Sequence, residues 1–296
     1  MNQGFSLACW CGSSSGRQQF RTSAFGLVRC VSCGCYRIDP PPISRDEQAA
    51  NFYTCYYDRP KKSPAKPEAA RSSRFWDVVR HEASLAQLGE SVADIGCGEG
   101  HLCNELREAG CTKVVGLDVS RTRVERARAL YPEIEFYDRP IEQTGVATAT
   151  FDLLIMDNVI EHLPDPVVML RTLRQYLRPH GRIVVITPNM KSGHFRLLGR
   201  RWTPELAPHT HIYLFTPRSM QELLCNAGFH VDSVSSFHLP LYSLGALTAR
   251  VSSGDVKGAV WRAMQELGGI YGRLIGIGPM LYAVARRSGD GGAPER

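Results

Sequence analysis

The stretch VADIGCGEGHL (Val92–Leu102) combines an apolar run with glycines and a carboxylate. Gly96 and Gly98 have no Cβ, so a ligand can approach their backbone closely. Asp94 would repel a pyrophosphate but suits an ammonium or sulfonium group. Asp118 lies 20 residues after Gly98, at the end of a second apolar run, where a carboxylate can accept both hydroxyls of a ribose. The pattern predicts a site for an adenosine ligand with a cationic amino-acid tail.

Cysteines form the second chemical pattern. Five of the ten lie in the first 35 residues, in CWCG and CVSCGC, which disfavours a disulfide framework. Eighteen residues separate Cys11 from Cys30, a normal spacing for four thiolates at a tetrahedral zinc. We predict Cys9, Cys11, Cys30 and Cys33 as ligands; the alternatives are Cys35 in place of Cys9, or core thiols without metal. Four thiolates leave no open position, so this zinc would be structural.

The elements that must position these residues alternate between strands and helices. We expect strands at 91–96, 113–120, 134–138, 150–158, 182–189, 229–237 and 279–287. We expect helices at 74–89, 99–110, 121–132, 165–181, 216–228 and 255–276. This alternation predicts an α/β fold of the Rossmann-like type, with a parallel sheet covered by helices on both faces.

The predicted domain organisation follows from composition. Residues 1–40 form a small cysteine-rich head, and the proline-broken residues 41–74 form a linker or mobile segment. Residues 75–288 form the α/β domain, in which 190–215 is an irregular insertion that caps the site. The polar residues 289–296 are predicted to be a disordered tail.

Four motifs in order resemble class I S-adenosylmethionine-dependent methyltransferases: VADIGCGEGHL, VVGLDVS, FDLLIMDNVIEHLPDP and LRPHGRIVVITPN. The resemblance covers about residues 75–287 and implies a seven-stranded methyltransferase sheet. It also implies which residues bind each part of S-adenosylmethionine. Gly96 and Gly98 lie at its methionine end, Asp94 at its ammonium group and Asp118 at its ribose. Asp138 and the Ile141 backbone lie at its adenine, and Asp157 lies beside the cofactor.

The same resemblance bears on the methyl acceptor. No (D/N)PP(Y/F) motif follows the strand at 150–158, which disfavours methylation of exocyclic amines on bases. Instead, NVIEHLPDP (Asn158–Pro166) resembles small-molecule methyltransferases, including the quinone-biosynthesis O-methyltransferases. His162 in this stretch either acts as a base or lines the pocket, or it only packs the following helix.

The predicted cap adds further candidates. PHTHIYLFTPRSM resembles the same segment of methyltransferases with a zinc-ribbon-like head, and LVRCVSCGCYRIDPPP resembles that head itself. The resemblance places His211 toward the active site, with His209 two residues before it. Imidazole titrates near neutrality and can remove a proton from a phenol or alcohol. Trp202, Tyr213 and Phe215 either wall an aromatic acceptor or pack the cap.

Charge is unevenly distributed. Residues 81–190 carry 11 Lys/Arg against 16 Asp/Glu, whereas both flanks are basic. We expect methyl transfer to an oxygen of a small acceptor, aromatic or anionic, in specialised or envelope metabolism. The alternative is an RNA methyltransferase whose head and basic flanks bind RNA.

No apolar run reaches the ~20 residues of a membrane span, and no signal peptide is evident, so the expected location is the cytoplasm.

Overall fold

The computed structural model describes residues 8–42, 90–201, 206–237 and most of 260–287, of which 261–262, 265–266, 269, 273 and 276 are left out. Several predictions therefore lie outside the described residues: most of the linker, the helix at 74–89, Trp202 and the tail at 289–296. The described chain divides into two compact units. Unit 1 comprises residues 1–42, 187–220 and 234–282, and unit 2 comprises residues 43–186, 221–233 and 283–296.

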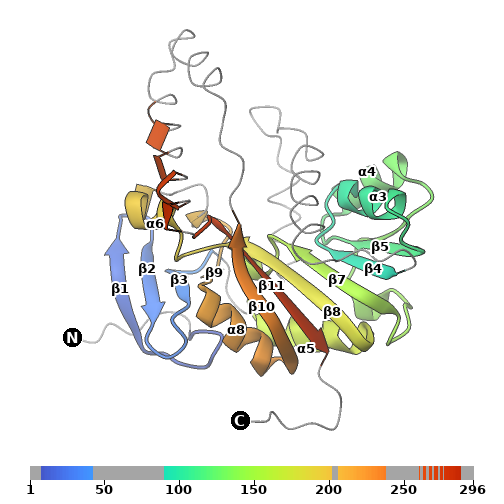
Figure 1. Cartoon of the computed structure of the whole chain (residues 1–296), viewed down its shortest axis with the longest axis horizontal. Coiled ribbons are helices and arrows are strands. Elements are labelled where there is room, and N and C mark those ends of the chain that lie inside the picture. The colour runs from blue at the N-terminus through green and yellow to red at the C-terminus, as the bar shows by residue number, and fades with distance from the viewer. Residues whose placement is uncertain are drawn as a thin grey trace. The chain divides into compact units, whose positions relative to one another are not determined.

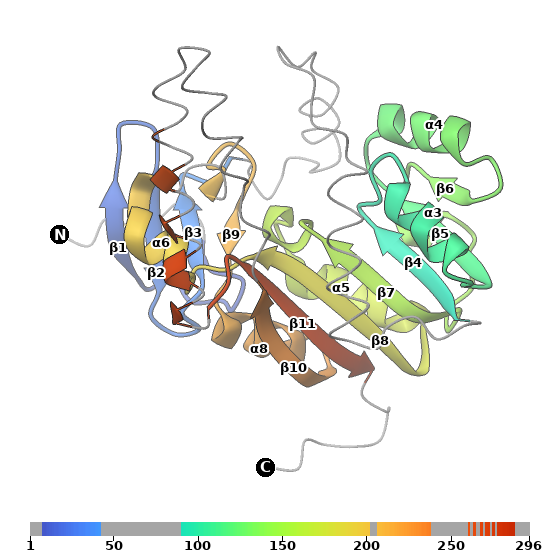
Figure 2. The ribbon, with the colours of Figure 1, turned by 45° about the horizontal axis from the view of Figure 1, so that its top comes forward.

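A seven-stranded sheet forms the main part of the fold, with strand order β10-β11-β8-β7-β4-β5-β6 (Figures 1 and 2). Its strands are β4 (Ser91–Ile95), β5 (Lys113–Leu117), β6 (Glu135–Tyr137), β7 (Phe151–Asp157), β8 (Leu177–Pro188), β10 (Phe229–Phe237) and β11 (Met280–Arg287). From β6 through β8 every neighbouring pair is parallel. All five residues of β4 are buried, as expected of a parallel strand covered on both faces.

Helices and short turns lie between successive strands along the chain. They are α3 (His101–Glu108), α4 (Arg121–Leu130), α5 (Pro166–Tyr176) and α8 (Pro217–Asn226), with short 3-10 turns η1 (Ile141–Gln143) and η2 (Ile160–His162). α3 packs against β4 and β5, and α4 packs against β6 (Figure 2). Ser120 caps α4 by accepting a hydrogen bond from the Arg123 N–H. The Rossmann-like fold class predicted from the alternation is confirmed.

Unit 1 contains a second, four-stranded sheet of order β1-β2-β3-β9. Its strands are β1 (Gly16–Arg21), β2 (Gly26–Cys30), β3 (Tyr36–Asp39) and β9 (Tyr213–Leu214), with α6 (Gly193–Leu198) and η3 (Gly199–Arg201) in the same unit. Residues from the beginning of the chain and residues after β8 share one apolar cluster in this unit: Leu27, Tyr36, Ile38, Met190, Leu198, Leu206 and Leu214.

One predicted boundary is wrong. The helix expected over 165–181 ends at Tyr176, and β8 begins at Leu177, five residues before the expected strand. Pro179 explains the difference, because proline breaks a helix interior and disfavours α conformation in the residue before it. Leu177 instead pairs with Phe151 of β7. Among the described residues, no helix is both long and apolar enough to cross a bilayer.

Candidate active site

The glycine-rich loop after β4 takes a backbone conformation that other residues rarely adopt. Gly96, Gly98 and Gly100 have φ angles of 83°, 58° and 80°. The N–H groups of Gly96 and Cys97 both donate to the Leu117 carbonyl, at 2.6 and 3.0 Å, which holds the loop against the end of β5. A Cβ on Gly96 would collide with the Val159 side chain. The loop thus requires glycine both for its φ angles and for its close packing.

Two buried carboxylates flank this loop. Asp94 in β4 is 3% exposed, and Asp118, directly after β5, is 8% exposed. One Asp118 oxygen accepts from the Gly98 N–H at 2.9 Å, and the other accepts from the Ser120 N–H at 2.8 Å. Asp118 therefore joins the glycine-rich loop to the start of α4. Its predicted role at a ribose stays a prediction.

Sequence reasoning missed Arg123, whose guanidinium lies 3.6 Å from Asp118. An arginine in the first turn of α4 was the available signal, because a cation is unfavourable near a helix N-terminus unless it has an anionic partner. It also missed Cys103 in α3, whose thiol donates to Asp94 at 3.7 Å. Burial, aided by the negative charge of Asp94, raises the pKa of Cys103 well above its ordinary value, so this group remains a thiol near neutral pH.

The remaining cofactor candidates also lie near the carboxyl ends of strands. Asp157 ends β7 and accepts from the Asn158 side-chain amide at 2.6 Å. Asp138 follows β6 and lies 3.6 Å from Arg128 and 3.9 Å from Arg139. Ile141 is buried at the start of η1. Arginines thus lie beside Asp138 as Arg123 lies beside Asp118, and the role of Asp138 at the adenine stays a prediction.

The three candidate histidines differ in their exposure. His162 ends η2 in unit 2 and is half-buried. His211 belongs to unit 1 and is 7% exposed, and its backbone N–H donates to the Ala207 carbonyl at 2.9 Å. His209 is exposed. Tyr213 and Phe215 are fully buried and pack with ring centroids 6.4 Å apart, which favours the packing role over substrate contact.

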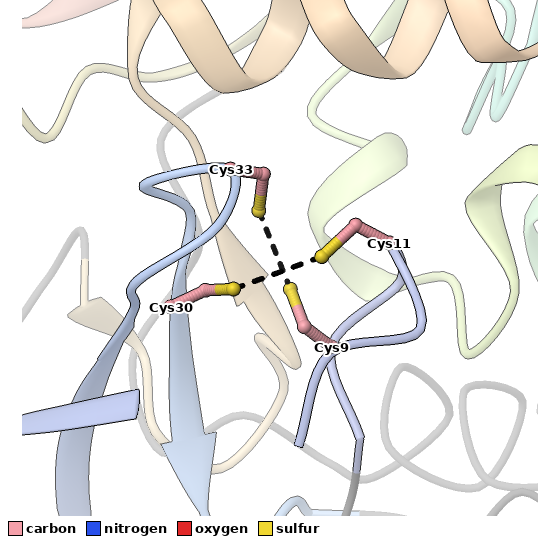
Figure 3. Close-up of side chains that lie close together, drawn as sticks. All are labelled: Cys9, Cys11, Cys30 and Cys33. Atoms are coloured by element: carbon pink, nitrogen blue, oxygen red, sulfur yellow. Dashed lines mark hydrogen bonds between the residues drawn. The ribbon is translucent and has the colours of Figure 1, made fainter. Parts of the chain in front are cut away.

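Four cysteines in unit 1 converge on one point (Figure 3). Cys9 and Cys33 have sulfurs 3.6 Å apart, and those of Cys11 and Cys30 are 3.7 Å apart. All four sulfurs lie within 4.8 Å of one another. A tetrahedral zinc with Zn–S bonds of about 2.3 Å requires sulfurs about 3.8 Å apart. The geometry therefore fits a zinc ion, and the separations are far longer than a disulfide bond.

The turns around this thiolate cluster are built alike. Gly12 and Gly34 both have positive φ angles, 84° and 73°. Their N–H groups donate to the carbonyls of Cys9 and Cys30, at 2.8 and 3.1 Å. The contact between the Cys9 and Cys33 sulfurs lowers the pKa of Cys9 and raises that of Cys33.

Cys35 lies outside the group of four. Its thiol donates to the carbonyls of Tyr36 and Leu214, each at 3.3 Å. Carbonyl oxygens around a sulfur favour a protonated thiol over a metal-bound thiolate. Of the two alternatives for the fourth ligand, the structure brings Cys9 into the cluster.

The chain is similar in sequence to known proteins. A family model described as a methyltransferase domain matches residues 68–234. A probable S-adenosylmethionine-dependent methyltransferase from Mycolicibacterium smegmatis is 30% identical over 198 residues, covering 65% of this chain and 73% of the relative. A ubiquinone biosynthesis O-methyltransferase from Nitrosococcus oceani is 28% identical over 211 residues, covering 68% of this chain and 86% of the relative.

Solved structures agree on the fold. An S-adenosylmethionine-dependent methyltransferase from Mesorhizobium loti aligns with a TM-score of 0.51 at 23% identity, covering 72% of this chain and 98% of that one. Geranyl diphosphate C-methyltransferase from Streptomyces coelicolor aligns with a TM-score of 0.58 at 12% identity, covering 83% of this chain and 100% of that one. Together with the glycine-rich loop and its flanking acids, these matches show that the chain belongs to the methyltransferase domain family and is a class I S-adenosylmethionine-dependent methyltransferase.

Proposed function

We propose that this enzyme methylates an oxygen atom of a small molecule. The observation that carries the proposal is the match to a ubiquinone biosynthesis O-methyltransferase over 86% of that relative's length. The sequence after β7 supports it, because it lacks the motif of base-amine methyltransferases and reads NVIEHLPDP instead.

The cofactor site is formed by the residues at the ends of β4 and β5. When bound, S-adenosylmethionine supplies an electrophilic methyl group. The backbone of Gly96 and Gly98 gives it room, since neither residue carries a Cβ. Asp94 and Asp118 supply negative charge toward its cationic amino-acid end and hydrogen-bond acceptors toward its ribose. Burial of both carboxylates strengthens these interactions, because the surroundings screen charge less than water does.

A hydroxyl acceptor must lose its proton during methyl transfer, and a histidine is the suitable base. His162 and His211 are the better candidates, because both are at least half-buried, whereas His209 is exposed. We infer that the base is one of these two. Replacing the base by glutamine should lower kcat and remove the acidic limb of the pH–rate profile, while the same change at the other histidine leaves that limb in place.

The acceptor class can be tested with S-adenosylmethionine carrying a labelled methyl group. Catechols and phenols are paired with anilines of the same carbon skeleton, and total RNA is a third substrate. We expect label in the hydroxyl compounds and none in their aniline partners. Label that enters only the anilines refutes oxygen transfer, and label that enters only RNA establishes the RNA alternative instead.

We also infer that Cys9, Cys11, Cys30 and Cys33 bind a structural zinc. The sulfur separations near 3.7 Å support this, and four thiolates leave no coordination position for a substrate. The matched pair Cys9→Ser and Cys35→Ser tests the ligand set, because each removes one buried thiol from the same module. Purified Cys35→Ser should contain one zinc per chain by mass spectrometry, and Cys9→Ser should contain little. Equal zinc in the two variants contradicts the assignment.

A further inference from the structure

The thiolate cluster and the segment that carries His211 are parts of one folded unit. The first three strands do not make a core by themselves. Leu27 and Ile38 pack in the same cluster as Leu206 and Leu214, which come from beyond β8. The cysteine-rich head therefore completes its apolar core with residues of the predicted cap.

Backbone pairing joins the same two parts. β9 adds to the edge of β3, with Tyr36 opposite Leu214 and Arg37 opposite Tyr213. The Ile38 N–H donates to the Ile212 carbonyl at 3.1 Å. Since Ile212 directly follows His211, the position of β3 determines where the backbone of His211 lies.

Two contacts lead directly from the turn between the ligands Cys30 and Cys33. The Ser32 carbonyl, inside this turn, accepts from the Arg218 guanidinium of α8 at 3.3 Å. Just beyond the turn, the Cys35 thiol donates to the Leu214 carbonyl at 3.3 Å. The Cys30 N–H in turn donates to the Cys35 carbonyl at 2.8 Å. The turn is thus connected to β9 through Leu214 and to α8 through Arg218.

We propose that metal loading of the thiolate cluster positions the His211 segment, residues 206–216, with Cys35 and Arg218 as the positioning residues. Metal binding to four thiolates stabilises the turns that hold them, and that free energy is available to every element folded with those turns. The cluster then stabilises the segment that carries His211, through β3 and β9, in addition to stabilising the cysteine-rich head. The link to catalysis rests on the proposed role of His211; the structural link does not.

Hydrogen–deuterium exchange on the full chain tests the structural link. The zinc-loaded protein is compared with protein treated with a zinc chelator, and with treated protein to which zinc is returned. We expect amides of 206–216 to lose at least about tenfold in protection along with those of β2 and β3, and to recover it with zinc. Amides of β4, β5 and β7 serve as the internal reference and should not change. Unchanged protection in 206–216, while β2 and β3 become exposed, overturns the proposal.

Variants of Cys35 and Arg218 keep all four cysteine ligands, so they test the hydrogen bonds to Leu214 and Ser32 without changing metal binding. Cys35→Ala removes the bond to Leu214, whereas Cys35→Ser keeps a donor. Arg218→Ala removes the bond to Ser32, and Arg196→Ala is its control as an exposed arginine of α6. With zinc content unchanged, the two alanine variants at 35 and 218 should show about three- to tenfold faster exchange in 206–216, the effect of one lost hydrogen bond. Equal exchange in Cys35→Ala and Cys35→Ser refutes the assignment of Cys35.

Kinetics connects the segment to the reaction. Arg218→Ala should raise KM for the acceptor or lower kcat while the affinity for S-adenosylmethionine stays the same, and Arg218→Lys should restore part of the loss. Altered exchange with normal kinetics would retain the structural link and reject the role of His211. Normal exchange with normal O-methylation would reject the structural link and retain the proposed function.

Discussion

Substitution of Gly96 by alanine should damage this enzyme in a way that can be separated into two physical effects. The first is backbone strain, because Gly96 has a φ of 83° and a residue with a Cβ at positive φ costs about 1–2 kcal/mol. The second is overlap with Val159, since the new methyl group would occupy the space of its Cγ2 atom. Overpacking of this kind costs about 1–3 kcal/mol. The free energy of unfolding should therefore fall by about 2–5 kcal/mol.

Gly145 provides a matched control. Its φ of 80° is nearly the same, but a Cβ there would have no heavy atom within 4 Å. Gly145→Ala should lose only the strain of about 1–2 kcal/mol. The double variant Gly96→Ala/Val159→Ala removes the overlapping Cγ2 and should recover about 1–3 kcal/mol relative to Gly96→Ala, after correction for Val159→Ala alone.

Urea unfolding, monitored by the hydrogen-exchange protection of β4 and β7 in unit 2, gives these free energies of unfolding. Calorimetric titration with S-adenosylmethionine gives the functional counterpart: we expect at least about tenfold weaker binding for Gly96→Ala, because a displaced loop no longer approaches the ligand closely. Binding to Gly145→Ala should stay within about twofold of the parent protein. If the two alanine variants lose the same stability, or if Val159→Ala restores none of it, the reasoning about close packing is wrong.

Two further predictions concern ionisable groups of unit 2. Asp118→Asn should weaken S-adenosylmethionine binding roughly 10- to 100-fold with little change in circular dichroism. The reason is that the substitution removes a charged hydrogen-bond acceptor beside the buried Gly98 N–H. Unchanged affinity would contradict the assignment of Asp118 to the ribose. Burial, with the charge of Glu90 adding to it, raises the pKa of Cys111 to about 11. Because the folded pKa lies above the unfolded value of 9.0, the buried thiol contributes stability in full below pH 9.0 and loses that contribution as pH rises toward about 11. Cys111→Ala should therefore show a smaller loss of stability between these pH values, and an identical loss in both proteins would refute the shift.

The glycine-rich loop after β4 was predictable because its signals are local. An apolar run followed by glycines, as at Val92–Gly100, specifies a buried strand, a turn with positive φ and a helix start within a dozen residues. The cysteine cluster was predictable for a similar reason, since a Cys-Gly pair marks each turn. What these patterns do not contain is the choice between Cys9 and Cys35, which depends on the carbonyl of Leu214 from far along the chain.

The head and cap were harder to predict because their signals are long-range. β1 reads GRQQFR and is mostly exposed, so it lacks the apolar alternation that indicates a strand. β9 is only two residues long and exists because β3 offers it an edge. For Arg123, its place in the first turn of α4 signals that it needs an anionic partner, but only the placed side chains identify that partner as Asp118.

The pairing of Tyr36 with Leu214 also has a consequence for how this protein is made. Translation proceeds at about 5–20 residues per second, so roughly 10 to 35 seconds pass between synthesis of β3 and synthesis of its partner β9. During that interval the four cysteines are already outside or leaving the ribosome, while the apolar cluster that should cover β2 and β3 is incomplete. The nascent head therefore lacks part of its apolar core during this time, and early binding of metal by its thiols would protect them from oxidation until the rest of unit 1 is synthesised.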